Sequence, residues 1–141
     1  MKSLTAIILA AVLASGCATT GDGGIERTKG ERLLDKYEPY LGEPVDSFPA
    51  LRYDSWQPIS RTQLVLWTTI NDAYLLTVDN TCPELQFAQN VGVTSTTSSI
   101  STLDSVLVRG HRCQIREIQP IDVRRMKADR NAREAEEERP S

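Results

Sequence analysis

Few side chains in this sequence belong to the types that carry catalysis or bind metals near neutral pH. The chain has three Cys and one His, so acid–base and metal chemistry have few residues available. The grouping that could bind a metal is Cys82, His111 and Cys113, with Asp79 or Asp104 as a fourth ligand. A His-x-Cys spacing without any Cys-x-x-Cys pair is not typical of zinc sites. We therefore expect no metal site and no cofactor.

The same residues do not form a recognisable catalytic pattern. His111 lies between cations in the segment Arg109-Gly110-His111-Arg112, which is typical of a solvated turn. A Ser-His-Asp triad lacks support because no Gly-x-Ser-x-Gly turn is present. A redox pair of Cys82 and Cys113 would need a low-pKa thiol at a helix N-terminus, and neither Cys lies in such a pattern. The sequence therefore predicts a protein that is not an enzyme.

Two tryptophans are candidate ligand-binding residues. Trp56 and Trp67 could line a groove, because a tryptophan ring offers a large apolar face and one polar N–H. Trp67 lies in an apolar run and also suits core packing, whereas Trp56 lies between Ser55 and Gln57. Both are kept as candidates for a ligand site.

The N-terminal residues predict a targeting segment. Lys2 precedes an apolar or small run from Leu4 to Ala14, which is shorter than the roughly 20 residues that span a bilayer. The run is typical of a secretory signal peptide. The segment Leu13-Ala14-Ser15-Gly16-Cys17 resembles the lipobox of bacterial lipoproteins, although Ala14 stands where Leu is commoner. The resemblance implies that residues 1–16 are removed and that Cys17 carries a diacylglycerol; the alternative is an ordinary signal peptide that ends near a Cys.

The lipobox resemblance also implies a location. Ala18 follows Cys17, and the absence of Asp there implies transfer to the outer membrane, with the domain facing the periplasm. Two or three acyl chains on one residue give stable anchoring to a membrane. The membrane is therefore the first partner that we expect, bound through the N-terminal lipid. The chain has a formal net charge of −3, which becomes −4 when Lys2 is removed. An acidic domain neutralises no phosphates, so we expect no nucleic-acid partner.

Once Cys17 is assigned to the lipid, the cysteine count is even. Cys82 and Cys113 remain as one pair in an oxidising compartment. A bridge between them would close a loop of about 32 residues and stabilise the fold by about 3.5 to 4 kcal/mol in the chain-entropy model. The sequence therefore predicts a structural disulfide between Cys82 and Cys113, while the metal and redox readings stay open as lesser alternatives.

The length and composition indicate one modest domain. The chain has 141 residues, of which 40% are hydrophobic and 25% charged, and this excludes a multidomain enzyme. The Gly- and Thr-rich residues 17–30 are typical of a flexible tether. Residues 31–122 form the expected disulfide-stapled β-rich domain, and residues 123–141 a charged tail.

Hydrophobic spacing predicts a mainly β fold. Short runs rich in β-branched and aromatic residues, separated by turn signals, favour a small antiparallel roll or barrel. A short helix over residues 31–38 precedes them and ends before Pro39. The segment Leu64–Trp67 is apolar on both alternating faces, so we expect both to be covered, one of them by this helix. The expected strands are 51–56, 64–68, 73–78, 85–87, 91–93, 105–108 and 113–118, with a strand end and an exposed loop at 94–102.

The C-terminal tail has a helix-forming composition but no apolar stripe beyond Met126. Such a segment is a solvated helix or is disordered, and we favour a frayed helix that extends from the last strand. As a functional reading, it could be a docking arm for a partner in the cell envelope.

A family resemblance points the same way. Its main elements are Trp67, Tyr74-Leu75-Leu76, Cys82, Asp104-Ser105-Val106-Leu107-Val108 and Cys113-Gln114-Ile115. Together these are similar to the signature of an uncharacterised family of small Gram-negative bacterial lipoproteins with a two-cysteine domain of unknown function. The resemblance covers residues 48–122 and implies a disulfide and a β-rich fold, with no assigned activity.

These observations lead to one functional hypothesis and one alternative. We expect an outer-membrane-anchored periplasmic lipoprotein with a non-catalytic envelope or protein-interaction role, whose second partner is an envelope protein. The alternative is a small-ligand-binding module or an inhibitor of a cell-wall hydrolase.

Overall fold

The computed structural model describes residues 28–80 and 82–139. The expected signal peptide, the lipid-bearing Cys17 and most of the expected tether lie outside these residues. The helical elements are α1 (Lys29–Tyr37), the 3-10 turns η1 (Glu38–Tyr40) and η2 (Leu85–Phe87), and α2 (Val123–Glu137). The strands are β1 (Ser47–Pro49), β2 (Ser55–Pro58), β3 (Gln63–Trp67), β4 (Ala73–Val78), β5 (Gly92–Val93), β6 (Ser99–Ser101), β7 (Ser105–Val108) and β8 (His111–Ile121).

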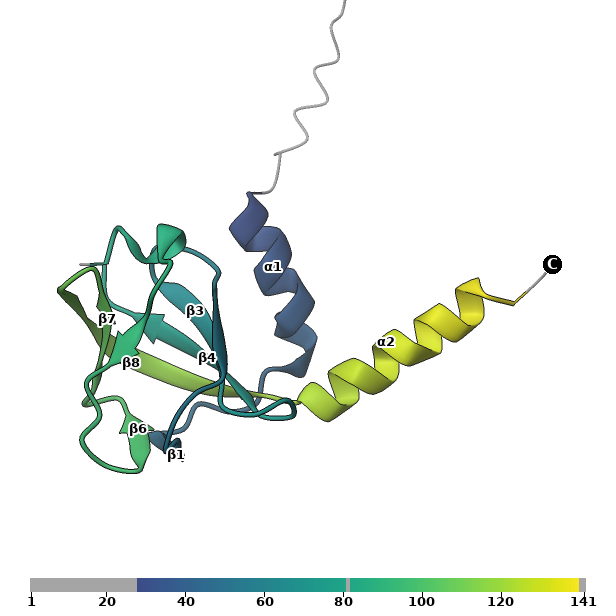
Figure 1. Ribbon diagram of the computed structural model, residues 1–141. Coiled ribbons are helices and arrows are strands. Elements are labelled where there is room, and N and C mark those ends of the chain that lie inside the picture. Colours follow the sequence, from purple (N-terminus) through teal and green to yellow (C-terminus); the bar gives the residue numbers. More distant parts are fainter. Residues whose placement is uncertain (1–27, 81, 140–141) are drawn as a thin grey trace, which may run out of the picture.

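The strands form two antiparallel sheets, which together make up the β body of the protein (Figure 1). Six strands lie in the order β2-β3-β4-β8-β7-β5 and curl into a half-barrel, while β1 pairs with β6 in a small second sheet. The half-barrel is not closed, so β2 and β5 are its edge strands. The mainly β class predicted from the sequence is confirmed.

Strand β8 runs through both halves of the curled sheet. Its first residues, 111–114, pair with β7, and residues 115–121 pair with β4. The register shifts between Thr77 and Val78, whose partners are Glu117 and Ile115, so Arg116 is an extra residue on β8. Such a bulge increases the local twist and bends the strand. This bend turns the β7–β5 side toward the β3–β2 side.

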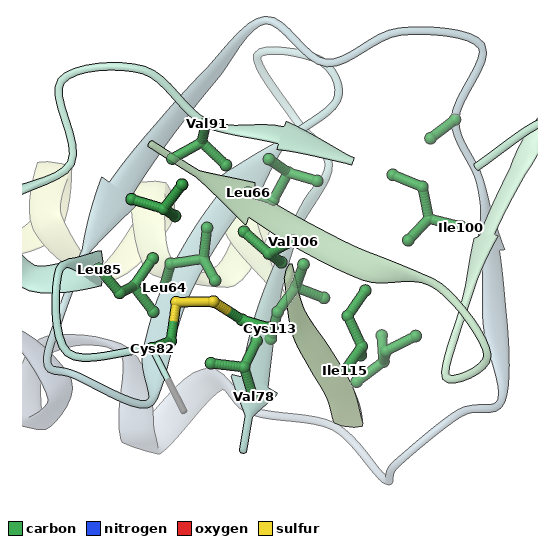
Figure 2. Packing of buried hydrophobic residues seen from close by; sticks show 14 of the residues in the cluster. Leu64, Leu66, Val78, Cys82, Leu85, Val91, Ile100, Val106, Cys113 and Ile115 are labelled. Atoms are coloured by element: carbon green, nitrogen blue, oxygen red, sulfur yellow. A yellow bond between two sulfur atoms is a disulfide. The ribbon is translucent and has the colours of Figure 1, made fainter. Parts of the chain in front are cut away.

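The two faces of the sheet bury separate hydrophobic cores. On the concave face, Leu64 and Leu66 of β3 pack in the larger core, which includes the buried Cys82 and Cys113 (Figure 2). On the other face, Val65 packs with Tyr37, the last residue of α1, and with Tyr40 of η1. Alternation along β3 therefore buries both of its faces, as the continuous apolar run predicted, and the N-terminal helix is the cover.

Helix α1 begins at a capping box. The Thr28 hydroxyl accepts from the Glu31 backbone N–H at 3.2 Å, and the Glu31 carboxylate accepts from the Thr28 backbone N–H at 2.7 Å. These two bonds satisfy N–H groups that a helix terminus otherwise leaves unpaired. Gly30 lies so close to the Ile59 backbone carbonyl that a Cβ there would overlap it. Glycine therefore permits the close approach of α1 to the sheet.

Three short segments differ from their expected structure. Within the expected strand end and exposed loop at 94–102, residues Ser99–Ser101 form β6, in which Ile100 is buried. The predicted strand at Leu85 and Phe87 is the 3-10 turn η2, in which Leu85 is buried and Phe87 exposed. The alternation of apolar and polar residues there belongs to one turn, in which Leu85 alone packs into the core. The predicted edge strand at residues 51–56 begins later, at Ser55, where pairing with β3 starts.

Helix α2 follows β8 directly and extends away from the β body (Figure 1). The Asp122 carboxylate caps it by accepting from the Arg125 backbone N–H at 3.0 Å. Val123 is buried and Met126 half-buried, whereas every residue from Ala128 to Arg139 is exposed. The tail is thus a helix, as favoured from its composition. Among the described residues, no helix is long and apolar enough to cross a membrane.

Candidate functional site

An open groove of about 850 Å³ lies between α1, the end of β2 and the turn η2. Helix α1 forms one wall, and η2 with the residue after it contributes another through Gln86, Phe87 and Ala88. Residues Gln57–Ser60, from edge strand β2 and the turn after it, also line the groove. The groove thus combines three elements that are distant in the sequence.

Contacts at both ends of α1 hold this wall of the groove in place. The capping box holds its first turn, and Gly30 brings the helix against Ile59. At the other end of α1, the Tyr37 hydroxyl donates a hydrogen bond to the Gln57 side-chain oxygen. Burial raises the pKa of Tyr37, so its hydroxyl, which is protonated at neutral pH in any tyrosine, remains a donor to higher pH than usual.

The lining offers apolar contact with a few polar groups. Leu33 and Leu34 are half-buried, and Phe87 remains 64% exposed although it is a large aromatic side chain. The charged side chains are Lys29 and Glu31, of opposite sign, and the amides Gln57, Gln63 and Gln86 complete the polar part. Concave sites that pair apolar surface with a small number of polar groups are suited to binding.

The structure separates the two candidate tryptophans. Trp56 pairs with Leu66 and packs against the larger core, where its ring makes an edge-to-face contact with Tyr53 at 6.3 Å. Trp67 packs against the other core, with Val65. They point to opposite faces because neighbouring strand positions alternate. Neither is among the residues that line the groove.

Cys82 and Cys113 form a disulfide, as predicted, with their Cα atoms 5.4 Å apart. Both are buried among Leu64, Leu85 and Val78 (Figure 2), so the bridge joins the segment before η2 to strand β8 inside the core. Consumed in this bond, the two sulfurs cannot also serve as free thiols.

The remaining candidates for chemistry lie apart from one another. His111 is exposed at the start of β8, after a turn in which Arg109 and Gly110 have positive φ. The Asp104 carboxylate accepts from the Ser101 N–H at 2.8 Å and so stabilises a turn, whereas Asp79 lies 3.6 Å from Arg116. Within residues 28–80 and 82–139, no group of three His, Cys, Asp or Glu side chains could hold a metal.

The sequence did not predict this groove, because no local pattern marks the residues that line it. Phe87 is the groove residue that the sequence could have indicated. Its period-2 alternation with Leu85 predicts a strand, but a turn after Cys82-Pro83 would leave one of these two side chains outside the core. Leu33 and Leu34 lie in the predicted helix over residues 31–38, and both are partly buried against the core that contains Val65.

Comparison with known proteins gives a family and no activity. No curated protein and no solved structure matches the chain at a significant level. A model of a family of unknown function matches residues 1–137, which confirms the expected membership in an uncharacterised family. Because this match covers nearly the whole chain, the protein belongs to the family of unknown function DUF6491.

Proposed function

We propose that this protein is a non-catalytic lipoprotein of the Gram-negative cell envelope that binds an extended segment of a partner protein in the groove beside α1. The observation that carries the binding role is Phe87, which stays 64% exposed in a groove that also contains Leu33 and Leu34. An exposed aromatic side chain in a concave apolar site gains most from a partner that covers it.

The shape and edge of the groove favour a polypeptide as the occupant. Residues of edge strand β2 line it, and an exposed edge can pair with an extended chain. Pro58 has no N–H to donate, so pairing along the whole of β2 is blocked. The partner segment would therefore bind mainly through an apolar side chain between Leu34 and Phe87, with hydrogen bonds to the glutamine amides.

Phe87→Ala is expected to reduce partner binding strongly without destabilising the fold, because its exposed side chain contributes little to the core. The matched control is Leu103→Ala, since Leu103 is 89% exposed and lies outside the groove. A photo-crosslinking residue at position 87, and another at 57, should both attach to one continuous segment of the same partner in living cells.

Four further results decide the proposal. The crosslinks from positions 87 and 57 should disappear in a Leu34→Lys variant, and a crosslinker at position 103 should not capture that segment. A bound small molecule at position 87 would favour the alternative of a ligand-binding module. Crosslinks from positions 87 and 103 to the same set of proteins would contradict the groove as the binding surface.

The anchor in this proposal is Cys17. The lipobox-like segment ending at Cys17 supports it, and the buried disulfide suits the oxidising compartment that an outer-membrane lipoprotein facing the periplasm would occupy. Such an anchor holds an acidic domain at an anionic surface that would not attract it by charge.

Cys17→Ser is expected to move the protein from the membrane fraction to the soluble fraction, because it removes the site of the acyl chains. Mass spectrometry of the mature wild-type chain should find Cys17 as the first residue with diacylglycerol on its sulfur. Ser15→Ala is the matched control, since it retains a small residue before the Cys and should leave the protein in the membrane. An unmodified thiol at Cys17 in membrane-derived protein would refute the anchor.

A further inference from the structure

The charges of α2 are arranged against its helix dipole. The helix N-terminus carries partial positive charge, so acidic residues are favoured in the first turn and basic residues in the last. Here the first turn has no acidic residue and the last turn no basic one. The basic residues are Arg124, Arg125, Lys127, Arg130 and Arg133, and the acidic run is Glu134, Glu136, Glu137 and Glu138.

The N-cap Asp122 places one carboxylate at the N-terminus of α2, but the other contacts within the described chain compensate little of this arrangement. The i,i+4 pair between Arg130 and Glu134, at 3.8 Å, has the less favourable order, with the base N-terminal to the acid. Arg125 lies over the Tyr40 ring, 5.8 Å from its centroid, and Lys127 donates to the Ile70 carbonyl. The acidic run is exposed throughout.

One side of α2 carries small side chains and faces away from the β body. Contacts to the body come from Val123, Met126 and Lys127, and from Asp129, which accepts from the Tyr40 hydroxyl at 3.0 Å. Arg125 also contacts the body, since its guanidinium lies over the Tyr40 ring. At about 100° per residue, the three exposed alanines 128, 132 and 135 fall together on the opposite side. Small side chains there permit a second helix to approach closely.

We propose that α2 pairs with α2 of a second copy of this chain, antiparallel, across this alanine face. In that orientation the basic half of each helix lies along the acidic half of the other, and the two helix dipoles oppose each other. With Ala128 against the second copy's Ala135, Arg125 falls on the same flank as Glu136 of that copy. Arg124 falls on the other flank, beside Glu138. The charges that disfavour the single helix therefore stabilise the pair, and the interface is self-complementary about a two-fold axis.

The position of α2 allows this pairing. Because the helix extends away from the body (Figure 1), an antiparallel arrangement places the two bodies at opposite ends of the helix pair. A helix of 15 residues is only about 22 Å long, so the interface is small and the dimer weak. Since much of the attraction is between exposed charges, dimerisation should weaken as salt increases.

Cysteine crosslinking of the full chain tests the orientation. In an antiparallel pair, Ala132→Cys lies next to the two-fold axis, and a short thiol-specific crosslinker should join two copies. Arg139→Cys is the matched control, because its two copies would be about 22 Å apart along the axis. The wild-type chain sets the background from its native cysteines. Equal crosslinking at both positions would indicate a parallel pair, and none at position 132 would exclude the pairing; either result overturns the proposal.

Charge reversal tests the complementarity. Arg124→Glu with Arg125→Glu, or Glu136→Lys with Glu138→Lys, should raise the dissociation constant about tenfold or more in sedimentation velocity, because four attractive contacts become repulsive. Each double variant improves the match to the helix dipole, so loss of the dimer cannot be attributed to unfolding of α2. An equimolar mixture of the two variants, or all four changes in one chain, should restore dimerisation. A monomeric wild-type chain, or a mixture that stays monomeric, would refute the proposal.

Discussion

Reduction of the Cys82–Cys113 disulfide is expected to lower the free energy of unfolding by about 3 to 4 kcal/mol. The two residues are 31 positions apart, and opening a loop of that size restores conformational entropy to the unfolded chain. A domain of this size typically has about 5 to 15 kcal/mol of total stability, so the bridge contributes a large share. Guanidinium unfolding of the full chain, with and without reductant, measures the difference.

The variant Cys82→Ala with Cys113→Ala should reproduce the effect of the reductant and remove the response to it. Cys17→Ser is the control, because it removes a sulfur outside the bridge and should leave the dependence on reductant intact. The entropic explanation would be wrong if the reduced and oxidised chains unfolded at the same denaturant concentration.

Leu76→Ala is expected to cost about 2 to 5 kcal/mol, since it removes a fully buried side chain and leaves a cavity. Leu76 is 0% exposed on β4, with Leu64 and Ile118 as its partners on the two neighbouring strands. The central position of β4 in the six-stranded sheet limits how far its surroundings can relax.

Leu103→Ala provides the contrast for this core variant. It makes the same chemical change at a residue that is 89% exposed, and it should alter the free energy of unfolding by less than about 0.5 kcal/mol. Thermal and guanidinium unfolding of both variants measure the difference. Equal losses at positions 76 and 103 would contradict the assignment of Leu76 to the core.

Local patterns predicted several elements correctly because their causes are local. Apolar runs of β-branched and aromatic residues matched β3, β4 and β7, and the double-faced run at Leu64–Trp67 indicated cover on both sides. Pro39 marked the end of the regular helix, although the chain continues as the 3-10 turn η1 to Tyr40. Strand β8 is longer than the predicted strand 113–118, since it runs from His111 to Ile121. Its last residues, including Pro120, still pair with β4.

The sequence by itself determined the β-rich class and the pairing of Cys82 with Cys113, and it favoured a helix over disorder in the tail. The physical reason is that strand periodicity, the number of cysteines and helix propensity depend on the chain's own composition and spacing. Only the tertiary structure decided that Trp56 and Trp67 face different cores and that Phe87 lies with Leu33 and Leu34 in one groove. These outcomes depend on strand register and on the close approach of α1 at Gly30, which are set by packing between segments far apart in the sequence.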